Sequence, residues 1–172
     1  MEYTLAYEKR KTLSLTVCPD LTVLVKAPRG LSKTEIERFV LSHETWIENA
    51  KQRQKKRAET EKTLTEQRIA ELRALAAAEL PRRVAYFAEI MGVQPTGVKI
   101  TSAKTRFGSC SGKNSLCFSW RLMLYPPEAV DYVVVHELAH IKEKNHSAAF
   151  YKVVESVLPD YKARVKMLKE NI

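Results

Sequence analysis

The segment VVVHELAHIKEKNH, residues 133–146, constrains the fold more than any other part of the chain. His136 and His140 stand four residues apart, so on a helix their side chains share one face, with Cβ atoms about 5–6 Å apart. The preceding VVV requires a buried helix, where polar side chains without partners are unfavourable. Pro126 and Pro127 end the element before it, and Pro127 suits the first turn of a helix. The segment therefore predicts a buried helix that carries two histidines toward a common partner.

Zinc is the partner that this spacing favours. Neutral imidazole nitrogen binds zinc at about 2.0–2.1 Å, and a catalytic zinc site keeps one position for water. Glu137, next to His136, is then placed as a general base rather than as a ligand. We expect one Zn²⁺ per chain, or another divalent transition metal in its place. The alternative is a pair of core histidines that are satisfied by hydrogen bonds alone.

His146 is the expected third ligand, provided that the chain turns just before it. Asn145 can supply that turn, because asparagine tolerates the left-handed conformation. The spacing from His140 to His146 equals that of the metzincins, but those proteins need glycine where Glu143 stands, and no Met-turn signature follows. The metzincin assignment is therefore rejected. Glu143 and Glu155 are the substitute ligands if His146 is only a capping or surface histidine.

The rest of the chain predicts an α+β protein. Three short segments with strand-like alternation, YTLAYEK, TLSLTVC and LTVLVKAP, predict a small antiparallel meander. Ser32 and Glu35 have the spacing of a capping box, so a helix should begin there and fray in the basic run after Ala50. The segments GVKITSA and SLCFSWRLML predict two more strands, joined by the loop RFGSCSGKN.

A chain of 172 residues fits a single domain. Residues 1–60 should form its meander and first helix, and residues 61–172 the core around the histidine helix. The polar stretch RAETEKTLTEQ predicts a hinge between helices, followed by a second capping box at Thr63 and Glu66. Three cysteines without CxxC spacing predict reduced thiols. No stretch approaches ~18 apolar residues and no targeting pattern opens the chain, so we expect a cytoplasmic protein without membrane contact.

The formal net charge of +9 at pH 7 is concentrated outside the histidine segment. The densest basic run lies before the polar stretch and consists of Lys51, Arg53, Lys55, Lys56 and Arg57. Such a run can bind the phosphates of a nucleotide or nucleic acid. A solvated helix end, whose basic residues complement the helix dipole, is the favoured alternative.

The histidine helix and the segments before it resemble a known family. The stretches that carry the resemblance are RFGSCSGKNSLCFSWRLMLYPPEAVDYVVVHELAHIKEKNHSAAF and VLVKAPRGLSKTEIERFVLSHETWI, which are similar to the YgjP-like branch of the SprT-like zincin metallopeptidases. Membership implies a gluzincin-like core, in which a small antiparallel sheet lies over the HExxH helix. It also implies zinc bound by the three histidines, with Glu137 as base. Phe107 stands where the family usually has tryptophan, which keeps an aromatic ring.

These patterns predict a metal-dependent hydrolase, with hydrolysis of a peptide or protein substrate as the first choice. Arg106 and Arg121 are candidates for substrate binding, because guanidinium recognises planar oxyanions, although structural ion pairs are the commoner use. One alternative is a nucleoside triphosphate pyrophosphohydrolase on the same metal site, supported by charge alone. A second is a nucleic-acid-binding module with a structural metal, against which Glu137 argues, because a structural site does not use a base.

Overall fold

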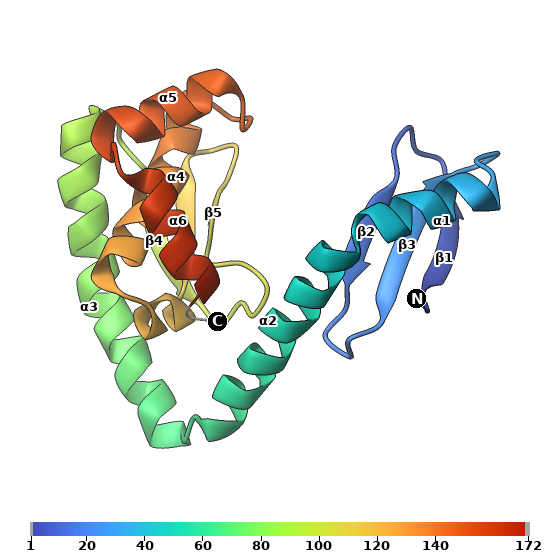
Figure 1. The fold of residues 1–172 in the computed structure, drawn as a ribbon. Helices are drawn as coiled ribbons and strands as arrows, with labels where there is room; N and C mark the ends of the chain where they lie inside the picture. The colour runs from blue at the N-terminus through green and yellow to red at the C-terminus, as the bar shows by residue number, and fades with distance from the viewer. Residues whose placement is uncertain (1, 171–172) are drawn as a thin grey trace. The chain divides into compact units, whose positions relative to one another are not determined.

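The structure, a computed structural model, describes residues 2–170. They form a mixed α+β protein with two compact units, one reaching to Thr63 and the other beginning at Leu64 (Figure 1). The boundary lies close to the expected division at residues 60 and 61, and a single functional domain built from both units stays a prediction. Within residues 2–170, no helix combines the length and the apolar character needed to cross a membrane. The three cysteines are free thiols, as expected.

The first unit is a three-stranded sheet with two helices. Its elements are β1 (Thr4–Glu8), β2 (Ser14–Val17), β3 (Val23–Pro28), α1 (Lys33–Ser42) and α2 (Glu44–Thr63). Val25 and Ala27 on β3 are fully buried against Ile36 of α1 and Ile47 of α2. The helices therefore cover the face of the sheet to which the alternating apolar residues point.

The expected antiparallel meander is wrong. The strand order is β1-β3-β2, with β1 parallel to β3 and β2 antiparallel to it. The third strand is the central one because it alternates fully buried apolar residues with half-buried ones over six positions, whereas β1 has no fully buried residue. Sequence alternation identifies a strand but does not say which neighbour it pairs with.

The helical boundaries test the capping predictions. The capping box of Ser32 and Glu35 is confirmed, with both reciprocal hydrogen bonds present. Two other expectations are wrong: α2 does not fray but continues through the basic run, and the cap of the next helix is Thr65 instead of Thr63. The basic run consists largely of Lys, Arg and Gln, which are good helix formers, and the Thr65 hydroxyl accepts from the Arg68 N–H.

The second unit contains the histidine helix. Its elements are α3 (Glu66–Met91), β4 (Gly97–Thr101), β5 (Gly108–Cys110), β6 (Ser115–Ser119), the 3-10 helix η1 (Trp120–Leu124), α4 (Pro127–Lys142), α5 (Ala148–Val157) and α6 (Tyr161–Glu170). α3 runs through Pro81 and ends at Gly92, which takes the left-handed conformation expected of a C-cap. The sheet order is β4-β6-β5.

The sheet of this unit also differs from the prediction of an antiparallel one. β4 pairs in parallel with β6, and only β5 is antiparallel. The strand β5 lies inside the expected loop, and β6 ends at Ser119, where the predicted strand should have continued to Leu124. The reason for the early end is local: the Ser119 hydroxyl accepts from the Arg121 N–H and caps the 3-10 turn.

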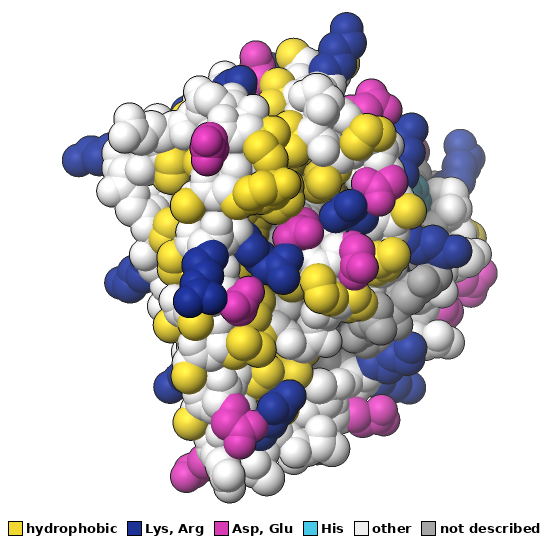
Figure 2. All heavy atoms as spheres, turned by 90° about the vertical axis from the view of Figure 1, so that its left-hand side faces the viewer, with side chains coloured by type: hydrophobic (Ala, Val, Ile, Leu, Met, Phe, Trp, Pro, Cys, Tyr) yellow, Lys and Arg dark blue, Asp and Glu magenta, His cyan; other side chains and the backbone are white. Residues whose placement is uncertain are grey.

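The histidine helix α4 is the centre of this unit, in contact with α3, α5, α6 and β5 (Figure 1). Its N-terminal half is held by charge as well as by packing. Asp131 pairs with Arg83 of α3 and lies 3.7 Å from Arg164 of α6. These partly buried pairs fix the position of α4 against α3 and α6. The side of the molecule seen in Figure 2 carries basic and acidic side chains among exposed hydrophobic ones.

Candidate metal centre

The helix α4 presents two histidines on one face while its other faces are buried. Val134, Val135 and Leu138 are completely buried, which fixes the rotation of the helix. The rings of His136 and His140 are then neighbours, with centroids 5.0 Å apart. The predicted buried helix and the shared face of the two histidines are both confirmed.

The chain turns back directly after α4 and brings His146 to the pair. The turn differs from the expected one: positive φ among the described non-glycine residues occurs only at Leu21 and Asn114, so Asn145 is not left-handed. Instead, Glu143 takes an extended conformation after the last helical residue, and Ser147 caps α5 through its hydroxyl. The third histidine thus lies in a short extended connection between two capped helices.

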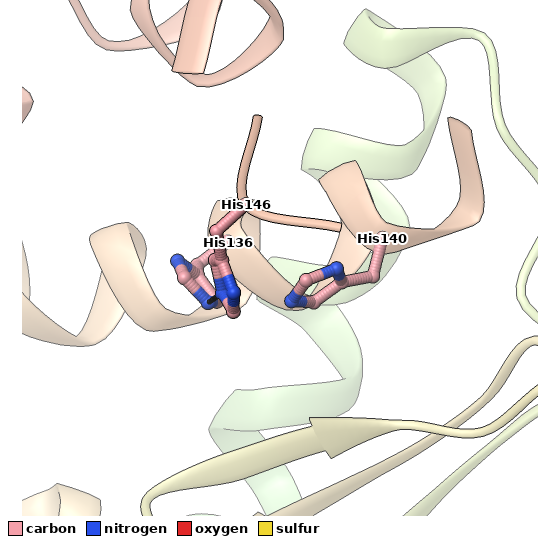
Figure 3. Close-up of side chains that lie close together, drawn as sticks. All are labelled: His136, His140 and His146. Atoms are coloured by element: carbon pink, nitrogen blue, oxygen red, sulfur yellow. Dashed lines mark hydrogen bonds between the residues drawn. The ribbon is translucent and has the colours of Figure 1, made fainter. Parts of the chain in front are cut away.

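The three imidazoles converge on one point (Figure 3). The Nε2 atoms of His136 and His146 are 3.0 Å apart, and one potential ligand atom from each histidine lies within 4.8 Å of the other two. Ligands of a tetrahedral zinc ion with 2.0–2.1 Å bonds are about 3.3 Å apart. The donor set therefore fits such an ion after small side-chain adjustments, and neutral imidazole is the donor type that zinc accepts.

Hydrogen bonds at the far side of two rings orient them toward the centre. His140 Nδ1 lies 3.1 Å from the carbonyl oxygen of Glu143; a carbonyl only accepts, so this nitrogen carries the proton and Nε2 keeps its lone pair. His136 Nδ1 lies 3.3 Å from the hydroxyl of Tyr132. Ligating histidines commonly have such outer partners, which orient the ring and set its tautomer.

Burial favours the neutral form of the two histidines on α4. It lowers the pKa of His136 to about 4, with the neighbouring histidines adding to the effect, and it also lowers the pKa of His140. Phe150 is the apolar group responsible in part, because its fully buried ring lies 4.6–4.9 Å from all three imidazole centroids. Neutral imidazole is the form that binds a metal ion.

Glu137 lies beside the centre without being part of the histidine cluster. Only 7% of its surface is exposed, and burial raises the pKa of its carboxyl to about 7, against an opposing effect of Arg106. An acid with a pKa near neutrality can both take and return a proton at neutral pH. The arrangement can therefore combine metal binding with acid–base chemistry.

The other candidate residues have different surroundings. Arg106 is exposed and acts on Glu137 electrostatically, so it belongs to the neighbourhood of the centre. Arg121 donates to the carbonyl of Ser102 at 2.8 Å and lies over the Trp120 ring, which are structural contacts. A part in substrate binding stays a prediction for both arginines.

The basic run lies on α2, in the first unit. Lys55 and Lys56 are exposed, while Lys51 and Arg53 are half-buried and Lys51 pairs with Glu48 at 3.4 Å. The side chain of Arg57 lies outside the described part of the structure. Polyanion binding by this run stays a prediction.

Sequence reasoning missed Tyr132 and Phe150. Tyr132 lies on α4, four residues before His136, and Phe150 lies on α5 with its ring against all three imidazoles. That spacing could have identified Tyr132 as a neighbour of the first histidine. Aromatic residues at such positions more often belong to an ordinary core, so the signal was weak.

Comparisons with known proteins identify a family and two solved structures to which this chain is similar. A family described as "YgjP-like, metallopeptidase domain" matches residues 11–71 and 55–171. No curated protein matches the chain. Among solved structures, the metallopeptidase zymogen abylysin of Pyrococcus abyssi is 25% identical, with 52% of this chain and 90% of that chain covered and a TM-score of 0.48. The metallopeptidase zymogen jannalysin of Methanocaldococcus jannaschii is 20% identical, with 55% and 98% covered and a TM-score of 0.48.

Proposed function

The chain belongs to the YgjP-like metallopeptidase family, and we propose that it is a zinc peptidase with one metal site at His136, His140 and His146. The observation that supports this most strongly is the convergence of three imidazoles on α4 and the connection after it, with the buried carboxyl group of Glu137 next to His136 in the sequence. We also propose that the second unit is a zincin-like core of the gluzincin type, in which β5 and α4 border the substrate cleft. The edge position of β5 in the sheet supports this, because an extended peptide can pair with a strand edge.

The mechanism assigns separate tasks to the chain's own residues. A bound zinc ion supplies the chemistry of a Lewis acid and lowers the pKa of water to about 7. Glu137 takes the proton of the attacking water and passes it to the leaving amine. The raised pKa of its carboxyl suits both transfers. Tyr132 and the carbonyl of Glu143 hold the imidazoles of His136 and His140 in the ligating orientation.

Peptide hydrolysis is favoured over hydrolysis of a phosphoanhydride. Within residues 2–170, the histidine cluster is the one group of potential metal ligands, and no carboxylate cluster of the kind that magnesium prefers accompanies it. Arg121, one of the two arginines considered for phosphate binding, is held by Ser102 and Trp120. Of these two arginines, Arg106 is then the remaining candidate for holding a phosphate near Glu137.

Two variants test the proposal. Glu137→Gln keeps the shape of the side chain but removes its basicity, so the metal should stay while turnover falls about 10²–10⁴-fold. His140→Ala removes a ligand and should cost metal, activity and thermal stability together. Metal content is measured by elemental analysis, and turnover with a fluorescence-quenched peptide library before and after chelation and zinc return.

The contradicting results are equally distinct. Full activity of Glu137→Gln means that this residue is not the base. Loss of metal by Glu137→Gln to the extent seen with His140→Ala makes it a ligand. Release of pyrophosphate from nucleoside triphosphates, with no peptide cleaved, replaces the peptidase by the pyrophosphohydrolase.

A further inference from the structure

Gly108, the first residue of β5, faces the carboxyl group of Glu137. A Cβ atom at this position would lie 2.7 Å from Glu137 Cγ, 2.7 Å from Oε1 and 2.9 Å from Cδ. Real Cβ atoms essentially never approach another heavy atom below 3.0 Å. The backbone of β5 therefore occupies the space directly against the carboxyl of Glu137, and any side chain at position 108 requires one of the two to move.

The backbone conformation gives no other reason for glycine here. Positive φ among the described glycines is found at Gly30 and Gly92, not at Gly108. A glycine inside a strand costs conformational entropy and often marks a place where another group approaches closely. Gly97, which opens β4 of the same sheet, has open space where its Cβ would be. The close approach to Glu137 thus distinguishes Gly108 from Gly97.

We propose that Gly108 is a positioning residue for the general base. The proposal rests on the proposed function, because it takes Glu137 as the group that moves the proton. The backbone of β5 at Gly108 lies against the carboxyl, and the buried helix α4 carries Glu137 itself. Because Val134 and Leu138 fix α4 by complete burial, the backbone of Glu137 cannot retreat from a new methyl group without disturbing the core.

A methyl group at position 108 should act on turnover and leave metal binding unchanged. The atoms that it meets include Cγ, in the middle of the Glu137 side chain, so the whole carboxyl must rotate away or β5 must shift. A displacement of about 1 Å in a reacting group can lower the rate about 100-fold. No histidine is among the three nearest atoms, so we expect Gly108→Ala to bind one zinc ion with wild-type affinity and to turn over about 100-fold more slowly.

The experiment compares Gly108→Ala with Gly97→Ala, which adds the same methyl group to the same sheet in open space. Each is made in the wild type and in Glu137→Ala, where the clash has lost its partner. Thermal midpoints and zinc affinity are measured for all variants, and peptide turnover for those that keep Glu137. Gly108→Ala should lower the midpoint in the wild-type background and have little effect in Glu137→Ala, while Gly97→Ala should behave alike in both.

The double-variant comparison keeps the proposal falsifiable if Gly108→Ala does not fold. In that case Gly108→Ala combined with Glu137→Ala should still give soluble protein, and its failure to do so overturns the contact. An equal drop in the thermal midpoint in both backgrounds also overturns the contact. Wild-type turnover of Gly108→Ala overturns the positioning role. If the coupling in stability is found but Glu137→Gln is fully active, the contact stands and the role of Glu137 as base fails.

Discussion

The hydroxyl of Tyr132 offers a sharp test of how the metal site is organised. It lies 3.3 Å from His136 Nδ1, and burial raises the pKa of the phenol to about 12, so the group stays neutral. When Nε2 of His136 binds a metal ion, Nδ1 carries the proton and the hydroxyl accepts from it. Tyr132→Phe removes this one atom and keeps the ring, which stacks on Tyr161 at a centroid distance of 6.5 Å.

The size of the effect follows from the geometry of that hydrogen bond. A hydrogen bond between protein groups contributes about 0.5–1.5 kcal/mol net, and outer partners of metal ligands are worth about 10–100-fold in metal affinity. The distance of 3.3 Å is long for an N–H···O bond, which places the effect at the lower end of this range. We expect zinc affinity to fall about 10-fold, which corresponds to about 1.4 kcal/mol.

Competition with a fluorescent zinc chelator measures this difference directly. Tyr161→Phe is the matched control, because it removes a hydroxyl from the adjacent stacked ring without touching a histidine contact. The midpoint of the metal-free protein should be nearly the same in both variants, since both rings remain. Wild-type zinc affinity of Tyr132→Phe, or an equal loss in Tyr161→Phe, refutes the role given to the Tyr132 hydroxyl.

Three further predictions concern stability and charge. Phe150→Ala removes the buried ring beneath the histidines and should lower the free energy of unfolding by about 3–5 kcal/mol, with a smaller loss for Phe150→Leu in the same urea titration. In the metal-free protein, the pKa of His136 is lowered, so its contribution to the free energy of unfolding decreases as the pH drops from about 6.5 to about 4. The pKa of Glu137 is raised, so its contribution to the free energy of unfolding increases as the pH drops from about 7 to about 4.5. The two effects oppose each other, so the free energy of unfolding of Glu137→Gln, measured by urea titration, should fall more steeply than that of the wild type as the pH is lowered through this range. The same pH dependence in both proteins contradicts the reasoning. Replacing the basic run of residues 51–57 by glutamines should weaken nucleic-acid binding and its salt dependence without changing peptide hydrolysis, and unchanged binding in a fluorescence titration identifies the run as a solvated helix.

The convergence of the histidines could be predicted because it depends on local geometry. Residues four apart on a helix must share a face. His146 follows His140 by six positions, so one turn of the chain after the helix suffices to close the cluster. The capping box at Ser32 was predictable for the same reason. It is decided by two neighbouring residues whose side chains hydrogen-bond to the local backbone.

Features that depend on distant partners could not be predicted. Alternation shows that β1 and β3 are strands, but their parallel pairing depends on which strand can be buried most fully at the centre. β5 has only the residues Gly108, Ser109 and Cys110, whose strand propensity is low, and it exists because β6 pairs with it. The contact between Gly108 and Glu137 joins residues far apart in the sequence, so no local sequence pattern predicts it.

The order of the ligands along the chain has a consequence for biosynthesis. All three histidines lie within residues 136–146, after the whole sheet of their unit and before α5 and α6. A ribosome therefore releases the complete ligand set in one step of a few residues, onto strands that have already been made. Phe150 and Arg164, which support the histidines and α4, emerge only afterwards. A nascent chain thus carries all three imidazoles before the ring of Phe150 that packs against them has been made.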